Sequence, residues 1–388
     1  MKAFRSQVVF GLVGVLAAGW ASLGAKPHID ARYRQVNLVS DVAGTARFTD
    51  SNLVNAWGIA LVPGGPIWIS DNGTGLSTVY DRDGTPRTLI VTIPAPLGST
   101  DPATPTGMIF NNGGAFAVTE GTNSASSTFI WATEDGTIAG WNRTVNPTNA
   151  VLAVDNSASG AVYKGIARAS DSSSNEFVYV TNFHDGTVEK YDANFNFVSS
   201  FTDTSLPDGF APFGIRNING ELFVTFALQD EDKHDDAAGP GNGFVDVFDA
   251  DGNLVRQFAA NGTLNSPWGL ALAPSQFGNF SNALLVGNFG DGRINAFDAA
   301  SGAFLGQLTD RRGNPITIDG LWGLDFGQLQ RTPSQAGEHE SAEAKMHEEK
   351  DKVLTTTVLY FTAGPAKESH GLFGFLTPAP GRHGRHHD

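Results

Sequence analysis

The chain has 388 residues, no cysteine, and a formal net charge of −15 from 25 basic and 40 acidic residues. The absence of cysteine excludes disulfides and thiolate chemistry, and the charge argues against nucleic acid or an anionic membrane surface as a partner, because both would repel the protein. The composition, with 46 glycines and only 17% charged residues, favours many short strands joined by tight turns.

The chain opens with a segment typical of a secretory signal peptide. Lys2 and Arg5 precede an apolar run of about 14 residues, and the small residues that follow allow cleavage after Gly24 or Ala25. This run is shorter than the ~20 residues that a membrane-spanning helix needs. Residues 1–25 are therefore predicted to be removed, no second hydrophobic span follows, and the mature protein is expected to be secreted or periplasmic.

A repeated unit then accounts for the rest of the chain, and its clearest copy covers residues 266–302. Each copy starts with a strand that contains a glycine after Trp, Phe, Thr or Lys. We call these the signature glycines: Gly58, Gly107, Gly165, Gly214, Gly269 and Gly323. They are 49, 58, 49, 55 and 54 residues apart, which is the length of a four-stranded meander with loops. The pattern predicts an all-β fold, a single six-bladed β-propeller over residues 33–377.

The signature has a mechanical interpretation. The first strand of each blade lies nearest the axis, where backbones crowd and a side chain would collide, so glycine is expected there. The Trp or Phe before it is interpreted as core, a wedge between adjacent blades, and not as a platform on which a ligand stacks. The hairpins contain Asp-Gly, as at Asp185 and Gly186, because tight turns need a positive φ.

The ring is predicted to be closed by the N-terminal strand. Residues 33–41 alternate like a strand but precede the first signature, while the last copy is one strand short. The N-terminal strand would supply the outer edge of blade 6 and remove the open edge of the array. Blade 2 contains five strand-like runs, one of them inserted. Residues 329–352 are interpreted as a polar insertion in blade 6, and residues 378–388 as a disordered His-rich tail.

The hairpins between the second and third strands of the blades are expected to meet at one rim of the central channel. Loops that converge on a rigid scaffold are the usual place for function. Asp291 and Glu368 belong to this rim. The candidate binding residues are Asp71, Asn72, Asn182, His184, Asn288 and His370.

The longest of these hairpins, residues 229–243, is strongly acidic. It has five carboxylates between Asp230 and Asp236, with Lys233 as the only fixed opposing charge. Carboxylates this close repel one another, so the loop either stays splayed in water or binds a cation. The cation would be Ca²⁺ or, with His234 and neighbouring His184 as ligands, a transition-metal ion. The candidate metal ligands are Asp230, Asp232, His234, Asp235 and Asp236.

The repeats resemble those of NHL and SMP-30-type propellers. Over residues 33–377 the chain is similar to an uncharacterised family of secreted bacterial six-bladed propeller proteins, and this resemblance implies the fold and export. The stretches that carry it are NAWGIAL, SDNGTGLSTVYD, TEDGTIAGWN, TNFHDGTVEKYD, QDEDKHDDAAGPGNGFVDVFD, GNFGDGRINAFD and LYFTAG.

Two classes of function follow. The first is a monomeric binding module that presents its rim to a small molecule, a carbohydrate or a protein ligand, with or without a divalent cation. The second, implied by the resemblance to SMP-30-type propellers, is a metal-dependent hydrolase of lactonase or esterase type, in which Asn72, Asn182 and Asn288 resemble the asparagines that line the metal centre. The inner-strand glutamate that those enzymes use as a ligand has no match in NAWGIAL, so binding is favoured.

Overall fold

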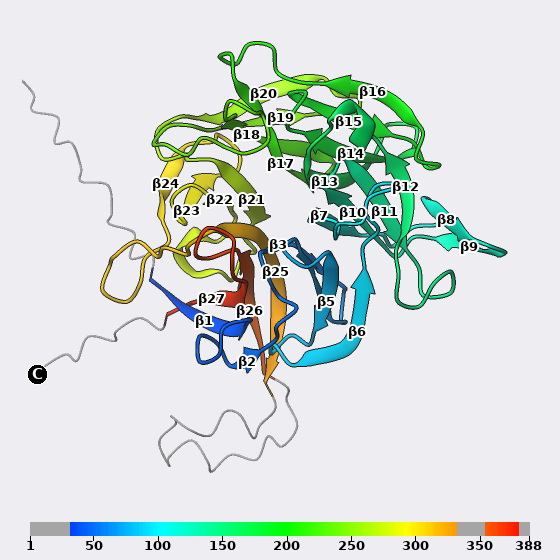
Figure 1. Cartoon of the computed structure of the whole chain (residues 1–388). Helices are drawn as coiled ribbons and strands as arrows, with labels where there is room; N and C mark the ends of the chain where they lie inside the picture. Colours follow the sequence, from blue (N-terminus) through cyan, green and yellow to red (C-terminus); the bar gives the residue numbers. More distant parts are fainter. Residues whose placement is uncertain (1–31, 332–353, 380–388) are drawn as a thin grey trace, which may run out of the picture.

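The strands form blades arranged in a ring around a central channel (Figure 1). The computed structural model describes residues 32–331 and 354–379, and within them there are six sheets of four or five strands and one two-stranded sheet. The chain is therefore the all-β, six-bladed propeller that the sequence predicts. Among these residues, no helix has the length and apolar character required for a membrane crossing.

Blades 1 to 5 are four-stranded antiparallel sheets whose first strand lies nearest the channel. Blade 1 consists of β3 (Ala56–Leu61), β4 (Ile67–Asp71), β5 (Leu76–Tyr80) and β6 (Pro86–Thr92). Blade 2 consists of β7 (Pro105–Phe110), β10 (Phe129–Thr133), β11 (Thr137–Trp141) and β12 (Val151–Asp155). Blade 3 consists of β13 (Tyr163–Ser170), β14 (Glu176–Asn182), β15 (Thr187–Tyr191) and β16 (Phe197–Phe201), preceded by the 3₁₀ turn η1 (Ser157–Ser159).

The next two blades repeat this plan. Blade 4 consists of β17 (Phe210–Ile218), β18 (Glu221–Leu228), β19 (Phe244–Phe248) and β20 (Leu254–Ala260). Blade 5 consists of β21 (Pro267–Leu272), β22 (Ala283–Asn288), β23 (Ile294–Asp298) and β24 (Phe304–Gln307), with the 3₁₀ turn η2 (Gly278–Phe280) between its first two strands.

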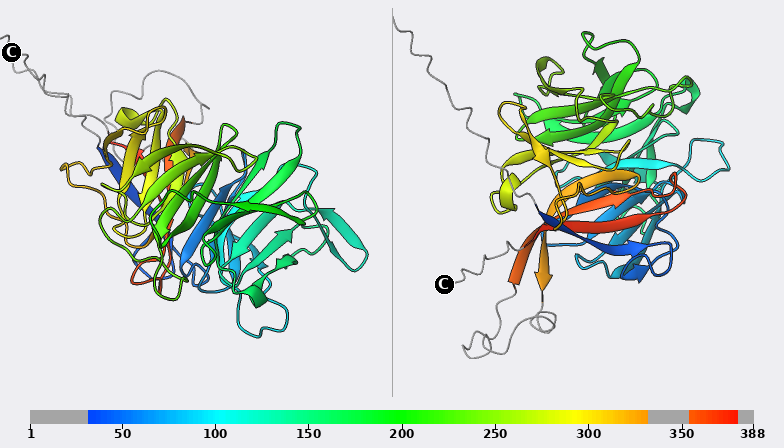
Figure 2. Two further views of the ribbon diagram at one scale, coloured as in Figure 1. Left: turned by 90° about the horizontal axis from the view of Figure 1, so that it is seen from above. Right: turned by 90° about the vertical axis from the view of Figure 1, so that its left-hand side faces the viewer.

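Blade 6 joins the two ends of the described chain. It consists of β25 (Leu321–Arg331), β26 (Leu354–Ala363) and β27 (Leu372–Pro378), followed in the sheet by β1 (Tyr33–Ser40) and β2 (Phe48–Thr49). β1 runs antiparallel to β27 with Tyr33 opposite Pro378, and the two lie side by side in Figure 2. The prediction that the N-terminal strand closes the ring is confirmed.

Two predicted boundaries need comment. The polar insertion was predicted to start at residue 329, but β25 continues to Arg331 and Leu329 is buried in the core of blade 6 and blade 1, because this strand pairs with β26 along its whole length. The rest of that insertion, the predicted signal peptide and residues 380–388 of the predicted tail lie outside the described residues, while Pro378 is still paired in the sheet.

The inserted element of blade 2 is a hairpin. β8 (Ala117–Glu120) and β9 (Asn123–Ser126) pair with each other between β7 and β10, and Figure 1 shows them projecting from the ring. This hairpin accounts for the longest spacing between signature glycines, which runs from Gly107 to Gly165.

The signature glycines let the inner strands approach one another. The inner strands β3, β7, β13, β17, β21 and β25 contact one another in that order around the ring, and β25 contacts β3. A Cβ on Gly58 would lie 2.4 Å from the carbonyl oxygen of Thr106 in the next inner strand, and one on Gly214 would lie 2.2 Å from that of Trp268. These distances are far below van der Waals contact, so the predicted crowding near the axis is confirmed.

The prediction that the aromatic residues before the signature glycines belong to the core is confirmed, but the prediction that they wedge between adjacent blades is wrong. They pack against one another in the central channel. The register shifts by a β-bulge at this point, for example between Ala56 and Ile59, and a bulge re-aims the side chain it contains. Trp57 and Trp322 stack at 3.6 Å and are both buried. We call the cluster the aromatic plug: Trp57, Phe183, Phe213, Trp268, Phe289 and Trp322.

Candidate functional site

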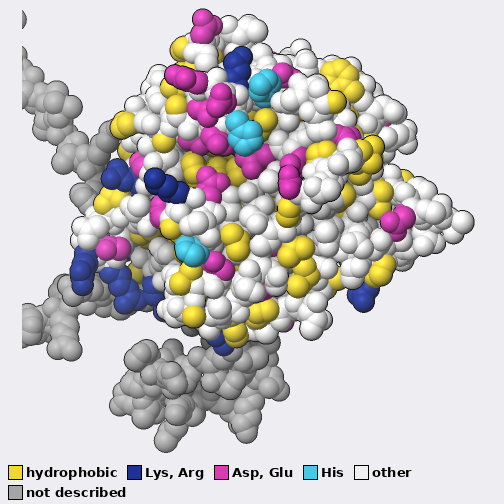
Figure 3. Space-filling view, in the orientation of Figure 1, with side chains coloured by type: hydrophobic (Ala, Val, Ile, Leu, Met, Phe, Trp, Pro, Cys, Tyr) yellow, Lys and Arg dark blue, Asp and Glu magenta, His cyan; other side chains and the backbone are white. Residues whose placement is uncertain are grey.

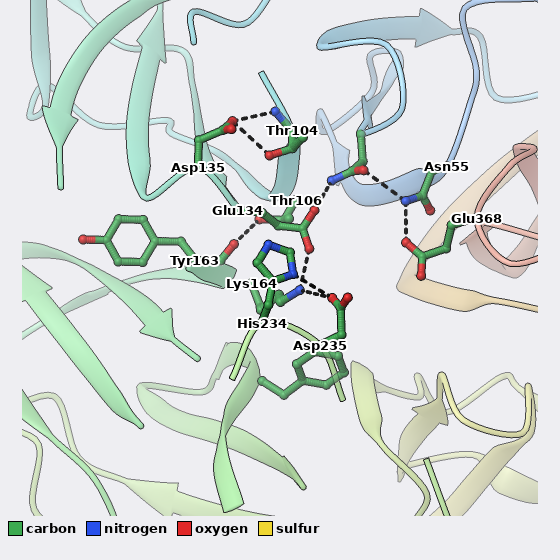
Figure 4. Close-up of polar contacts among 12 residues, drawn as sticks. Asn55, Thr104, Thr106, Glu134, Asp135, Tyr163, Lys164, His234, Asp235 and Glu368 are labelled. Atoms are coloured by element: carbon green, nitrogen blue, oxygen red, sulfur yellow. Dashed lines mark hydrogen bonds and ion pairs between the residues drawn. The ribbon is translucent and has the colours of Figure 1, made fainter. Parts of the chain in front are cut away.

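Polar side chains from five blades meet at one mouth of the channel, where the inner strands begin (Figure 4). The same face carries a concentration of acidic and histidine side chains around its centre (Figure 3). The hairpins between second and third strands open on this side, as predicted. We call the connected residues the mouth network: Asn55, Asn72, Glu134, Lys164, His234, Asp235 and Glu368.

Two asparagines of blade 1 link two carboxylates. The side-chain amide of Asn55 donates to Glu368 Oε2 at 2.7 Å and to Asn72 Oδ1 at 3.1 Å, and Asn72 Nδ2 donates to Glu134 Oε2 at 2.8 Å. Asn55 Oδ1 accepts from the indole nitrogen of Trp322 at 3.1 Å. The network is therefore anchored to the aromatic plug beneath it.

Lys164 is the cation at the centre of the network. Its side chain is 1% exposed, and its Nζ donates to Glu134 Oε1 and, at 3.1 Å, to Asp235 Oδ1. Burial lowers the pKa of Lys164, but the negative charges of Glu134 and Asp235 more than offset this effect and raise the pKa above its ordinary value. Lys164 is therefore protonated at neutral pH.

The acidic loop between β18 and β19 contributes His234 and Asp235. His234 Nδ1 lies 3.1 Å from Asp235 Oδ1. This hydrogen bond raises the pKa of His234, and together with Lys164 it holds the pKa of Asp235 well below its usual range. Asp236 is turned inward, and burial raises its pKa to about 6.

Three side chains of the network have the donor chemistry of a metal site. Glu134, His234 and Asp235 each offer one ligand atom, and these atoms all lie within 4.8 Å of one another. Two carboxylates and an imidazole fit a transition-metal ion better than Ca²⁺, which takes six to eight oxygen ligands. The donors thus fit a divalent metal, although Lys164 already bonds to two of them.

The predicted metal ligands are therefore only partly brought together. His234 and Asp235 face the channel mouth beside Glu134. Asp230 accepts the backbone N–H of His234 at 3.0 Å and shapes the turn, while Asp232 is exposed. Among the described residues, the group of potential ligands includes neither Asp236 nor His184.

Among the predicted binding residues, Asn72 is the member of the mouth network. Asp71 is fully buried below it and accepts from Thr78 Oγ1 at 3.2 Å, and burial raises its pKa well above the usual range. His370 Nδ1 lies 2.8 Å from Asp41 Oδ2, which ties the β26–β27 loop to the end of β1.

Asn182 and Asn288 stabilise their own hairpins. Asn182 Nδ2 donates to Asp185 and to Glu189, at 2.9 and 2.7 Å. Asn288 Nδ2 donates to Asp291 at 3.0 Å and also, at 2.8 Å, to the carbonyl oxygen of Thr263 in the preceding loop. His184 lies beside the acidic loop, because Gln229 Nε2 donates to its carbonyl oxygen at 3.3 Å.

Sequence reasoning missed Asn55, Glu134 and Lys164 as site residues. Lys164 precedes a signature glycine, and four of the six copies have an aromatic residue at this position. The lysine departs from that pattern, so it could have been identified from the sequence as a candidate site residue. Glu134 directly follows β10 as Asn72 follows β4, and that shared position could have indicated it.

Comparison with known proteins gives relatives without a stated activity. No family model matches the chain. It is 36% identical over 306 residues to "Uncharacterized protein R648" of Acanthamoeba polyphaga mimivirus, covering 75% of this chain and 74% of the relative. It is 33% identical over 306 residues to "Uncharacterized protein L690" of the same virus, covering 75% and 79%. These relatives are viral, whereas the resemblance noted above concerns bacterial proteins.

Solved structures with a similar fold are more distant. Virginiamycin B lyase from Staphylococcus aureus is 11% identical, with a TM-score of 0.45 and coverage of 89% of this chain and 99% of that chain. A luciferin-regenerating enzyme is 11% identical, with a TM-score of 0.48 and coverage of 84% and 92%. At these values the likeness carries no argument about activity.

Proposed function

The chain belongs to the protein family that includes R648 and L690 of Acanthamoeba polyphaga mimivirus, and we propose that it is a binding protein whose channel mouth takes a cationic ligand. The ligand is a divalent metal ion or the ammonium group of a small molecule or partner. The observation that carries this proposal is the excess of carboxylates around one buried lysine: Glu134, Asp235, Asp236 and Glu368 surround Lys164.

The single lysine leaves part of this negative charge without a cation. Lys164 bonds to Glu134 and Asp235, whereas Glu368 accepts its hydrogen bond from the neutral amide of Asn55. Burial, followed by the charge of Glu134, raises the pKa of Glu368 to about 7. A carboxyl group with a raised pKa is one whose ionised form is disfavoured, and a bound cation would relieve that cost.

A metal ion is the cation that the donor set favours. Glu134, His234 and Asp235 would hold it, and it would offer coordination positions to hydroxyl or carboxylate groups of a further ligand. Protonated Lys164 opposes a second cation nearby, so a bound metal ion competes with its ammonium group for Glu134 and Asp235.

The first prediction concerns Glu134→Gln. This variant should weaken binding by about tenfold or more, because it removes a negative charge close to the proposed cation while preserving the shape of the side chain. Binding is measured by calorimetric titration of the full chain with Zn²⁺ and, separately, with butylammonium. Asp232→Asn is the matched control, since Asp232 is an exposed carboxylate of the acidic loop outside the network, and its affinity should stay within about twofold.

The two titrations show whether the ligand is a metal ion or an ammonium group. Binding of Zn²⁺ alone would assign a metal site, and binding of butylammonium alone would assign an amine site. If neither cation binds, or if both variants have the same affinity, the proposal is wrong.

Metal-dependent hydrolysis is a second candidate, and one specific feature favours it. Glu368, with a pKa of about 7, belongs to the same network as the potential metal ligands and would suit a general base near neutral pH. The test is a panel of lactones and aryl esters with and without a chelator. Chelator-sensitive turnover that Glu368→Gln abolishes would support catalysis, and an inactive wild-type protein loaded with metal would leave binding as the function.

The proposal also includes export, which rests on the leader-like pattern of residues 1–25. Mass spectrometry of the protein recovered from a bacterial expression host should find a mature N-terminus after Gly24 or Ala25. An intact N-terminus in the cytoplasmic fraction would contradict export without affecting the binding proposal.

A further inference from the structure

A second cavity lies at the opposite mouth of the channel. It has a volume of about 410 Å³ and is lined by residues of all six inner strands. All six inner strands begin at the mouth of the channel that carries the mouth network, so their second halves, which line the cavity, reach the other mouth. The aromatic plug lies between the two sites, and Trp268 belongs both to the plug and to the cavity wall.

The walls of the cavity combine aliphatic side chains with polar groups. Each inner strand contributes an aliphatic or thioether residue to the lining: Ile59, Met108, Ile166, Ile215, Leu270 and Leu324. Trp268 is partly exposed there, whereas Trp57 and Trp322 are buried. A cavity of this size is typical of small-molecule sites, which range from about 300 to 1,000 Å³.

The charged residues of the lining are Asp325 and two arginines from neighbouring inner strands. Arg168 of β13 and Arg216 of β17 both line the cavity, and their side chains are 23% and 36% exposed. Arg168 Nη1 donates to the side-chain oxygens of Asn111 and Asn112, at 2.7 and 2.9 Å, and its Nε forms an ion pair with Glu176 Oε2 at 2.6 Å. These contacts fix the guanidinium group in place at the rim.

Arg216 is fixed in a similar way. Its Nη1 donates to the carbonyl oxygen of Leu324 at 2.9 Å, and its Nη2 bonds to Asp325 at 2.5 Å. Within the described part of the chain, Nη2 of Arg168 and Nε of Arg216 have no hydrogen-bond partner. Both guanidinium groups therefore keep donor capacity for a ligand while being held by protein contacts.

We infer that this cavity binds a small organic carboxylate, with its anionic head at Arg168 and Arg216 and its apolar body against Trp268 and the aliphatic walls. The planar fork of a guanidinium group matches a carboxylate, and two such groups held in place lose little conformational freedom on binding. The cavity lies at the other mouth from the mouth network and is proposed to bind an anion, whereas the mouth network is proposed to bind a cation. A negative result at one site therefore does not decide the other.

The test uses 4-phenylbutyrate and its uncharged analogue 4-phenylbutanol in calorimetric titrations of the full chain. We expect the acid to bind about tenfold or more tightly than the alcohol, because the two differ in the anionic head. The double variant Arg216→Met with Asp325→Asn removes the ion pair without leaving a lone charge, and it should lose this preference for the acid. Thermal unfolding of the variant checks that it folds.

Two control variants alter residues outside the cavity and should leave binding of the acid unchanged. Arg293→Met removes an arginine of the β22–β23 hairpin, which opens at the other mouth, and should bind the acid as the wild type does. Glu134→Gln, which tests the mouth network, should also leave acid binding unchanged. Failure of the acid to bind, or equal affinity for acid and alcohol, would overturn the inference.

Discussion

Gly214→Ala is expected to destabilise the folded protein by about 2–3 kcal/mol, the upper part of the range for inserting a methyl group into a packed core. The new Cβ would lie 2.2 Å from the carbonyl oxygen of Trp268 and 3.0 Å from Thr225 Oγ1. Since the nearest atom belongs to the backbone of the next inner strand, no side-chain rotation relieves the clash, and blades 4 and 5 must move apart. Urea unfolding measures the change in the free energy of unfolding.

Gly114→Ala is the matched control. Gly114 is exposed, its φ is not positive, and a Cβ there would have no atom within 4 Å. The expected change is within about 0.5 kcal/mol, as for most surface substitutions. Equal unfolding free energies for the two variants would mean that the inner strands are not packed through the signature glycines.

Lys164→Met is expected to destabilise the protein by about 3 kcal/mol at neutral pH, the low end of the range for removing one partner of a buried ion pair. Glu134, whose side chain is 10% exposed, would be left as an uncompensated charge, whereas Asp235, at 65%, would return to water. Adding Glu134→Gln to Lys164→Met should recover part of the loss, because the isolated charge is then gone. Urea unfolding of the four proteins of this double-mutant cycle measures the coupling.

The pH dependence provides an independent check on the same pair. The pKa of Lys164 is raised in the folded protein from an ordinary value of 10.5, so its contribution to stability is complete below that pH and is lost as the pH rises through the folded pKa. The difference in unfolding free energy between the wild type and Lys164→Met should therefore become smaller in alkaline solution. Lys367→Met, which changes an exposed residue of the β26–β27 loop, should have the unfolding free energy of the wild type at every pH. If Lys367→Met lowered the unfolding free energy as much as Lys164→Met does, the special role of Lys164 would be contradicted.

The ring could be predicted from the sequence because its determinants are local and repeated. The signature glycines mark the crowded inner strands, and the missing strand of blade 6 identifies β1 as its partner. The direction of Trp57 and Trp322 could not be predicted, because a β-bulge changes which way a side chain points without changing the residue pattern. Such a bulge occurs at four members of the aromatic plug: Trp57, Phe213, Trp268 and Trp322.

The candidate site was less accessible to sequence reasoning because it is assembled between blades. Asn72 follows β4, and Asn182 and Asn288 end the equivalent strands β14 and β22. Only a neighbour from the next blade makes Asn72 bond to Glu134, whereas Asn182 bonds within its own hairpin and Asn288 bonds to Asp291 and to the carbonyl oxygen of Thr263. The charge run from Asp230 to Asp236 revealed an acidic loop, but backbone geometry selects which members face the channel. Such contacts between distant segments leave no periodic signal.

Calorimetric titration of the wild-type protein is the most direct test of cation binding at the channel mouth. The titrant is whichever of Zn²⁺ and butylammonium binds, and it is used at about pH 5.5 and about pH 7.5, in two buffers of different ionisation enthalpy. With Glu368 at a pKa of about 7 and Asp236 at about 6, the cation must displace protons at the lower pH. Binding should therefore be about tenfold or more tighter at the higher pH, with proton uptake by the buffer. Equal affinity at both pH values and no proton release would contradict the account.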